Sequence, residues 1–152
     1  RLRLKSSDRK IRFIVMNIFI DTNVLLDVLN NRTPYYADSS SVWTLIEKAR
    51  FDGYISAINF NNIYYISRKV SKHSAIKKTL SLLRDIFKIL PLDEQIVAQA
   101  IDSEFKDFED AIQYFSAVRA NAECIISRNL NHYRKSDITV MTPSEFLVSG
   151  FM

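Results

Sequence analysis

Asn17-Ile18-Phe19-Ile20-Asp21-Thr22-Asn23-Val24-Leu25-Leu26-Asp27 is the stretch of this sequence that decides its fold. A short apolar run ends abruptly in a carboxylate, and a second apolar run with helical spacing follows it. Continuous hydrophobicity without polar alternation predicts a strand at residues 18–20 that is covered on both faces. Asp21 then lies at the carboxyl end of that strand, where open α/β sheets bind their ligands. Asp21 and Thr22 could instead serve only to cap the following helix, and both interpretations stay open.

The composition indicates one globular domain. The chain has 152 residues, of which 47% are hydrophobic, and this is enough for a single domain with a buried core. No apolar run approaches the ~20 residues that a membrane-spanning helix needs. Cys124 is the single cysteine, which excludes a disulfide framework or a cysteine-rich metal site and fits packing within a core strand. These features favour a reducing, cytoplasmic location without membrane association.

The basic charge of the chain is concentrated in residues 1–15. This segment holds six basic residues against one acidic residue, so the remaining chain is near neutral although the whole chain carries +4. The basic balance therefore gives no argument that the domain itself binds nucleic acid. We expect residues 1–15 to be a disordered arm or a leader that is not native, with Met16 as a natural start. Residues 16–152 are expected to form the domain.

Short apolar segments alternate with amphipathic segments along the rest of the chain. Further strands are predicted at residues 54–56, 89–92, 124–127 and 138–141. Helices are predicted between the strands, at residues 24–29, 38–50, 58–69, 74–87, 94–101 and 108–121, and Gly53 is expected to end the second of them. Thr142-Pro143-Ser144-Glu145 is a capping box with Pro at the first helical position, which predicts a terminal helix. The alternation predicts an α/β fold with a short parallel sheet of about five strands and helices on both faces.

Acidic residues crowd the start of the helix predicted at residues 108–121. Carboxylates favour the positive end of a helix dipole, so Asp107 as the N-cap needs no further role. Asp110 lies on the apolar side of the same helix, where a carboxylate requires a partner or a cation. Ser127 and Arg128 end the fourth predicted strand, so polar groups again stand at the carboxyl end of a strand.

Three motifs in this order resemble those of the PIN-domain family, nucleases that include the VapC-type toxins of toxin–antitoxin pairs. They are Ile18-Phe19-Ile20-Asp21-Thr22-Asn23-Val24-Leu25-Leu26-Asp27, Asp107-Phe108-Glu109-Asp110-Ala111-Ile112-Gln113 and Ile125-Ile126-Ser127-Arg128-Asn129. Each motif alone is weak evidence, but their order, spacing and placement at strand ends make the resemblance specific. It extends over residues 17–147 and implies a single PIN-like domain.

The resemblance implies an endoribonuclease that hydrolyses RNA phosphodiester bonds with Mg²⁺ or Mn²⁺. Such hard cations take oxygen ligands, and they activate water and polarise phosphoryl oxygens. The implied catalytic residues are Asp21, Asn62, Asp110 and Asn129; the implied metal ligands are Asp21, Glu109, Asp110 and Asn129; and the implied substrate-binding residues are Thr22, Asn23, Ser127 and Arg128. The implied partners are RNA, a cognate antitoxin protein and a second copy of the chain in a homodimer.

Two amides keep a second function open. Asn62 and Asn129 stand where the resemblance expects carboxylates, and an amide oxygen can bind a cation but brings no charge. The alternative is a catalytically degraded PIN-like module that binds RNA or a protein partner. A phosphatase with a strand-end Asp is disfavoured, because Asn23 occupies the place of the second Asp in its motif. His73 and His132 are expected to be lone surface histidines, far from the motifs.

Overall fold

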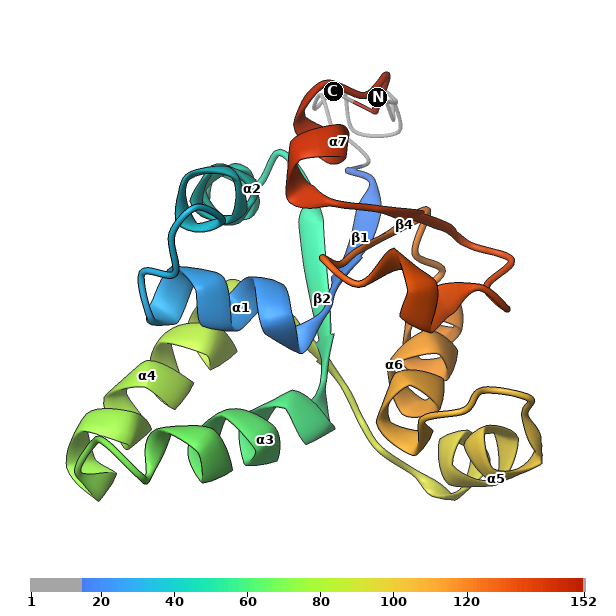
Figure 1. Cartoon of the computed structure of the whole chain (residues 1–152), viewed down its shortest axis with the longest axis horizontal. Helices are drawn as coiled ribbons and strands as arrows, with labels where there is room; N and C mark the ends of the chain where they lie inside the picture. Colours follow the sequence, from blue (N-terminus) through green and yellow to red (C-terminus); the bar gives the residue numbers. More distant parts are fainter. Residues whose placement is uncertain (1–14, 152) are drawn as a thin grey trace, which may run out of the picture.

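Five short strands form one parallel sheet at the centre of the molecule (Figure 1). The computed structural model describes residues 15–151. The strands are β1 (Asn17–Ile20), β2 (Asp52–Ser56), β3 (Lys88–Leu90), β4 (Cys124–Ile126) and β5 (Thr139–Met141). Their order in the sheet is β3-β2-β1-β4-β5, and every neighbouring pair is parallel. The predicted α/β fold with a five-stranded parallel sheet is confirmed.

The beginning of the domain differs slightly from the sequence-based boundary. Residues 1–14 of the predicted basic tail lie outside the described part of the chain. Val15 packs against the hydrophobic core, and Met16 is buried within it. The folded domain therefore includes at least one residue that was assigned to the tail.

Seven α-helices within residues 15–151 connect and cover the strands. They are α1 (Thr22–Leu29), α2 (Tyr36–Glu47), α3 (Ala57–Ser67), α4 (His73–Ile86), α5 (Glu94–Asp102), α6 (Phe108–Arg119) and α7 (Pro143–Leu147), with a 3-10 helix, η1 (Leu130–Tyr133), before β5. Side-chain oxygens of Asp21, Ser56, Asp93 and Asp107 cap four of the α-helices, and the predicted capping box begins α7. None of these helices has the length and apolar character needed to cross a lipid bilayer.

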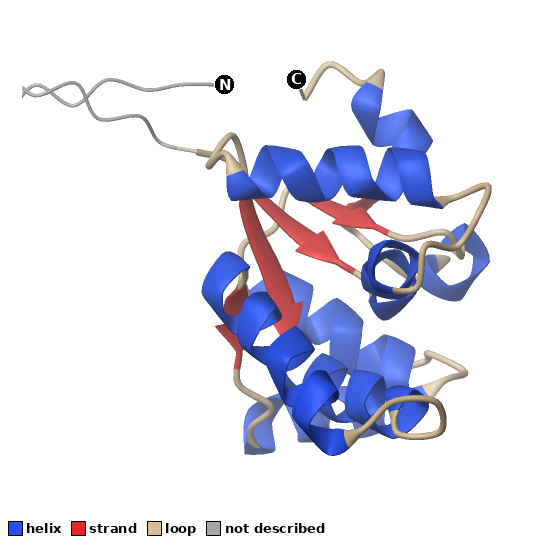
Figure 2. Ribbon diagram, turned by 90° about the vertical axis from the view of Figure 1, so that its left-hand side faces the viewer, coloured by secondary structure: helices blue, strands red, loops and turns tan. Residues whose placement is uncertain are grey.

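The strands of the sheet are buried on both faces. Ile18 and Ile20 belong to a core that includes residues of α1, α2, α4 and α7, whereas Phe19 points to the opposite core with residues of α6. The three residues of β4 divide between the same two cores, and Cys124 is fully buried as predicted. Figure 2 shows the strands fanned out in the twist that parallel sheets adopt. Burial on both faces explains why β1 is continuously apolar.

The strand order places the end of β1 where the chain changes direction across the sheet. From β1 the chain adds β2 and β3 on one side, and it later returns to add β4 and β5 on the other side. Asp21 follows β1 and Ser127 follows β4, and the Asp21 N–H donates to the Ile126 carbonyl at 3.0 Å. Ligands of α/β proteins bind at such a switch point. The fold thus brings the first and third motifs together.

Gly53 does not end a helix, so that expectation is wrong. It lies within β2, whereas α2 ends at Glu47 and the following turn contains Ala49 with a φ angle of 57°. A Cβ atom at Gly53 would lie 2.7 Å from Ile46 Cδ1 and 2.9 Å from Phe87 Cδ1. Glycine is required here because these two side chains approach the strand closely.

Gly53→Ala is expected to lower the free energy of unfolding by about 1–3 kcal/mol, because the added methyl overpacks the core. Urea denaturation measures the difference. Gly150→Ala is the matched control, since no atom lies within 4 Å of its Cβ position. The control should stay within about 0.5 kcal/mol of the parent. Equal stability of both variants would show that Ile46 moves aside without cost.

Candidate active site

Asp21 is buried at the end of β1, and both of its carboxyl oxygens accept hydrogen bonds. Oδ1 accepts from the Thr22 N–H at 2.7 Å, which caps α1. Oδ2 accepts from Ser127 Oγ at 2.7 Å and, at 3.4 Å, from Asn23 Nδ2. Burial raises the pKa of Asp21, and the hydrogen bonds from Ser127 and Thr22 lower it only in part. Capping of α1 therefore explains the hydrogen bond to Oδ1 of Asp21, but it does not explain why this carboxylate is buried.

Ser127 and Asn23 fix the ends of β1 and β4 to each other. Ser127 is fully buried, and its Oγ also accepts from the Asn129 N–H at 3.0 Å. Asn23 Oδ1 accepts from the Arg128 N–H at 3.3 Å. Both residues are predicted substrate contacts, yet their polar atoms are engaged within the protein. In this geometry they position Asp21. The Asn129 side chain is exposed and does not cap η1.

The Arg128 side chain is engaged by Asp27 and Tyr35. Its Nε donates to Asp27 Oδ2 at 2.8 Å, and its guanidinium lies 4.0 Å from the centroid of the Tyr35 ring. Asp27 is fully buried and also accepts from Ser39 Oγ at 3.2 Å. The guanidinium predicted to meet RNA phosphate instead anchors the end of β4 to α1 through an ion pair.

Asp110 brings a second carboxylate to the same end of the sheet. It lies in the first turn of α6, and its N–H donates to the N-cap side chain of Asp107 at 3.0 Å. Burial raises the pKa of Asp110 to about 6, and the charge of His132 opposes this rise. The charges of Asp107, Asp21 and Glu109 add to it. Asp21 and Asp110 therefore lie near enough to repel each other.

Glu109 and Asn62 extend this cluster across α6 and α3. Burial, followed by the charges of Asp21 and Asp107, raises the pKa of Glu109. The nearby side-chain amides of Gln113 and Asn62 lower it. Asn62 Nδ2 is itself buried, and Glu109 is the acceptor that it faces. The structure thus brings the position at which the resemblance expects a carboxylate close to Glu109.

A buried amide network joins α1, α3 and α6, and sequence reasoning assigned it no role. Gln113 Nε2 donates to Thr22 Oγ1 at 3.0 Å and to Asn59 Oδ1 at 2.8 Å. Both amide residues are fully buried, and the hydroxyl of Thr22, a predicted substrate contact, accepts from Gln113. Gln113 follows Asp110 by three residues, and Asn59 precedes Asn62 by three, so each shares a helix face with a predicted site residue. The three-residue spacing was the feature of the sequence that could have indicated this network.

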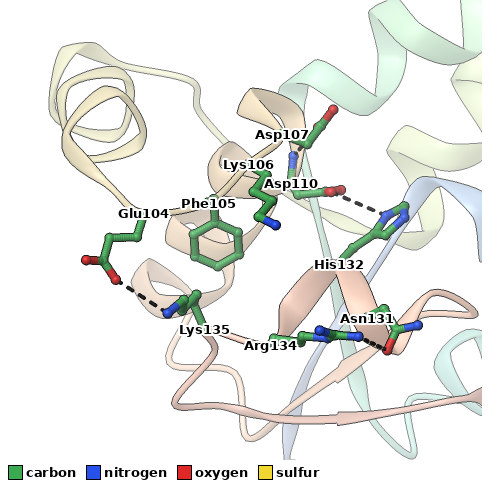
Figure 3. A pocket seen from close by; sticks show the side chains of 9 residues that line it. All are labelled: Glu104, Phe105, Lys106, Asp107, Asp110, Asn131, His132, Arg134 and Lys135. Carbon is green, nitrogen blue, oxygen red and sulfur yellow. Dashed lines mark hydrogen bonds and ion pairs between the residues drawn. The ribbon is translucent and has the colours of Figure 1, made fainter.

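His132 is not far from the motifs, and that expectation is wrong. The turn of η1 after Asn129 brings His132 Nδ1 to 3.3 Å from Asp110 Oδ2 (Figure 3). Tyr133, the next residue, is buried, and its hydroxyl faces the Asp21 carboxylate. Burial and the charges of Asp21 and Asp110 raise the pKa of this hydroxyl well above its ordinary value. Two residues of η1 therefore belong to the site.

The side chains at this end of the sheet include oxygen donors that could hold a hydrated divalent cation. No Lys or Arg within residues 15–151 forms an ion pair with Asp21 or Asp110, whose charges repel each other. No three side chains of His, Cys, Asp or Glu in the described chain lie close enough to hold an ion by themselves. Mg²⁺ commonly uses one or two carboxylates and retains several waters. The residues therefore fit a cation that keeps part of its water shell.

Known proteins resemble this chain in both sequence and fold. The family model described as PIN domain matches residues 17–131. Ribonuclease VapC1 of Aquifex aeolicus (strain VF5) is 29% identical over 134 residues, which cover 85% of this chain and 92% of that protein. A toxin-antitoxin complex from Klebsiella pneumoniae matches with a TM-score of 0.63 and 21% identity, over 83% of this chain and 97% of the other. VapBC2 from Rickettsia felis, bound to a promoter DNA fragment, matches with a TM-score of 0.63 and 15% identity, over 84% and 98%.

Arg128→Met is expected to lower the free energy of unfolding by about 3 kcal/mol, because it leaves the buried Asp27 carboxylate without its counter-charge. This is the low end of the range for such pairs, since the Arg128 side chain is still 23% exposed. Arg84→Met is the control, because Arg84 and its partner Asp85 are 64% and 66% exposed. Chemical denaturation should place the control within about 0.5 kcal/mol of the parent. Equal losses in both variants would contradict the anchoring role.

Asp110→Asn is expected to raise the melting temperature of the metal-free protein more at about pH 7.5 than at about pH 5. The folded-state pKa of Asp110, about 6, lies above its ordinary value of 3.8. Its charge therefore destabilises the fold progressively as the pH rises between these values, and fully above them. Thermal unfolding in EDTA measures the effect, with the exposed Asp85→Asn as control. The same gain at both pH values would refute a raised pKa.

Proposed function

Because this chain belongs to the PIN-domain family, we propose that it is a ribonuclease that hydrolyses RNA phosphodiester bonds with a bound Mg²⁺ or Mn²⁺. The observation that carries the proposal is that Asp21 and Asp110 lie within electrostatic reach of each other at one end of the sheet. Both carboxyls have a raised pKa, and neither has a Lys or Arg partner among residues 15–151. The similarity to Ribonuclease VapC1 over most of both chains supports RNA as the substrate.

The proposed metal ligands are Asp21 and Asp110, with Glu109 as a third carboxylate within electrostatic reach. A bound cation would polarise a phosphoryl oxygen and lower the pKa of the attacking water. Asp21 is already oriented by hydrogen bonds from Ser127 and Thr22, so little reorganisation is needed on binding. This ligand set carries less negative charge than the family pattern, because amides replace two of its carboxylates.

Asn62 and Asn129 are proposed as neutral members of the site. Asn62 lies near Glu109, where its amide can hold water or a phosphate oxygen. The exposed side chain of Asn129 is free to approach the substrate from η1. His132, at 3.3 Å from Asp110, competes in its protonated form with a cation for that carboxylate. Together these groups favour a cation bound largely through waters.

An antitoxin protein is the proposed partner, and a homodimer is the proposed state. The similar fold from Klebsiella pneumoniae was solved as a toxin-antitoxin complex, which supports a toxin role for this chain. The homodimer rests on the family resemblance. The proposed location is the cytoplasm, which fits an RNA substrate and a single free cysteine.

The second candidate is a catalytically degraded module that binds RNA or protein. The observation that favours it is the pair of amides, together with the lack of any three-residue His, Cys, Asp or Glu cluster in the described chain. This module would bind RNA without cleaving it, whichever divalent cation is present. The cleavage assay below separates the two functions.

Asp21→Asn is expected to reduce the rate of RNA cleavage by about 100-fold or more, because charge stabilisation at the reacting phosphate is lost. The parent should cleave with Mn²⁺ or Mg²⁺ and not with EDTA. Asp85→Asn, an exposed carboxylate on α4, is the matched control and should cleave as the parent does. Gel analysis of a labelled RNA measures all three proteins.

Two outcomes would overturn this mechanism. Cleavage by the parent protein in EDTA would show that the reaction needs no divalent cation. Unchanged cleavage by Asp21→Asn would show that the Asp21 carboxylate takes no part in it. A parent that binds the RNA but cleaves it with neither cation would instead establish the binding module.

A further inference from the structure

A pocket of about 770 Å³ opens beside the first turn of α6 (Figure 3). One wall is formed by residues 104–107 before α6, and the other by residues 131–135 of η1 and the turn after it. Asp110 lies in its lining, so the pocket adjoins the carboxylates of the candidate active site. The volume falls within the range of sites that hold small organic ligands.

The two ends of the pocket carry different charged groups. Figure 3 shows Asp107 and Asp110 at the acidic end, with Lys106 beside Asp110, and Arg134 and Lys135 at the other end, where Glu104 pairs with Lys135. The contacts that Lys135 and Arg134 make within residues 15–151 are exposed and weak. Lys135 lies 3.6 Å from Glu104, both mostly exposed, and Arg134 donates to Asn131 at 3.4 Å. Exposed ion pairs of this kind contribute little, so these cations can turn to a stronger anion.

Phe105 presents an aromatic surface between the two ends. Its ring packs against Tyr114 at 5.1 Å between centroids and against Phe115 at 6.4 Å, and it is half-buried. The remaining surface of the ring lines the pocket. A ring that is held in place by neighbours and open on another side is a stacking platform for a nucleic-acid base.

We propose that this pocket holds the nucleotide next to the scissile phosphate, with its base on Phe105 and its phosphate on Lys106 and Arg134. This inference rests on the proposed ribonuclease function and adds a substrate-binding subsite to it. The reacting phosphate lies at the acidic end, where a cation is needed to offset the carboxylates. The flanking phosphate lies between Lys106 and Arg134, whose own positive charges bind it without an added cation. The pocket thus offers carboxylates for a cation and exposed basic groups for a second phosphate of one RNA strand.

The test measures RNA binding apart from cleavage. A fluorescein-labelled single-stranded RNA of about 12 nucleotides is titrated with the full chain in EDTA, and its anisotropy is recorded at about 50 and 200 mM salt. The double variant Lys106→Ala/Arg134→Ala should bind about tenfold more weakly at low salt, and its salt slope should fall by about 0.7 for each lost phosphate contact. Phe105→Leu should bind about fivefold more weakly or worse.

Lys78→Ala/Arg84→Ala is the matched control, because it removes two exposed positive charges from α4. Its binding should stay close to that of the parent. Phe105 packs against α6, so its variant is first checked by thermal unfolding. Lys106 and Arg134 are exposed, and their double variant keeps the test valid if Phe105→Leu does not fold.

The outcomes distinguish the pocket from the proposed function. A parent that cleaves RNA with Mn²⁺, together with pocket variants that bind like the control, would refute the subsite and leave the ribonuclease intact. A loss of the same size in the control would also refute it, because the effect would then reflect total charge. A parent that neither binds nor cleaves RNA would overturn the function itself, and the subsite with it.

Discussion

The hydrogen bond between Ser127 Oγ and Asp21 Oδ2, 2.7 Å long, joins the ends of two neighbouring parallel strands, and the site depends on it. It holds a carboxylate in a buried position where burial opposes its charge. Asp110 and Glu109 add like charges nearby, and the pKa of each is raised as well. The metal-free site is therefore under electrostatic stress at neutral pH. A divalent cation would relieve that stress and so stabilise the fold through binding.

The groups around the carboxylates fall into two sets with different tasks. Ser127, Asn23 and the Arg128–Asp27 ion pair fix the geometry of the strand ends, and their polar atoms are already engaged. The amide network of Gln113 fixes α3 and α6 against α1 in the same way. The adjoining pocket lies between the segment before α6 and η1, and its charged side chains are mostly exposed and weakly paired. A carboxylate centre held by hydrogen bonds thus lies beside an open pocket.

Local signals in the sequence predicted the fold well. The apolar run of β1 and the caps at Asp21 and Asp107 act within a few residues, so the elements they define could be recognised without the structure. Gly53 was misread because its role is the close approach of Ile46 and Phe87, and those contacts exist only after folding. His132 was missed because the turn of η1, and not its distance in sequence, brings it to Asp110. Thr22, Asn23 and Arg128 were predicted to contact the substrate. Their hydrogen-bond partners within the protein come from other elements, so these contacts could not be seen in the sequence.

The central claim is that Asp21 and Asp110 share one divalent cation. A crystal structure of the protein soaked in Mn²⁺, with data collected at a wavelength where manganese scatters anomalously, measures this most directly. We expect one strong anomalous peak within about 2.0–2.6 Å of a carboxyl oxygen of both residues, with waters completing its coordination. No peak at this end of the sheet, or a peak that contacts only one of the two carboxylates, would contradict it.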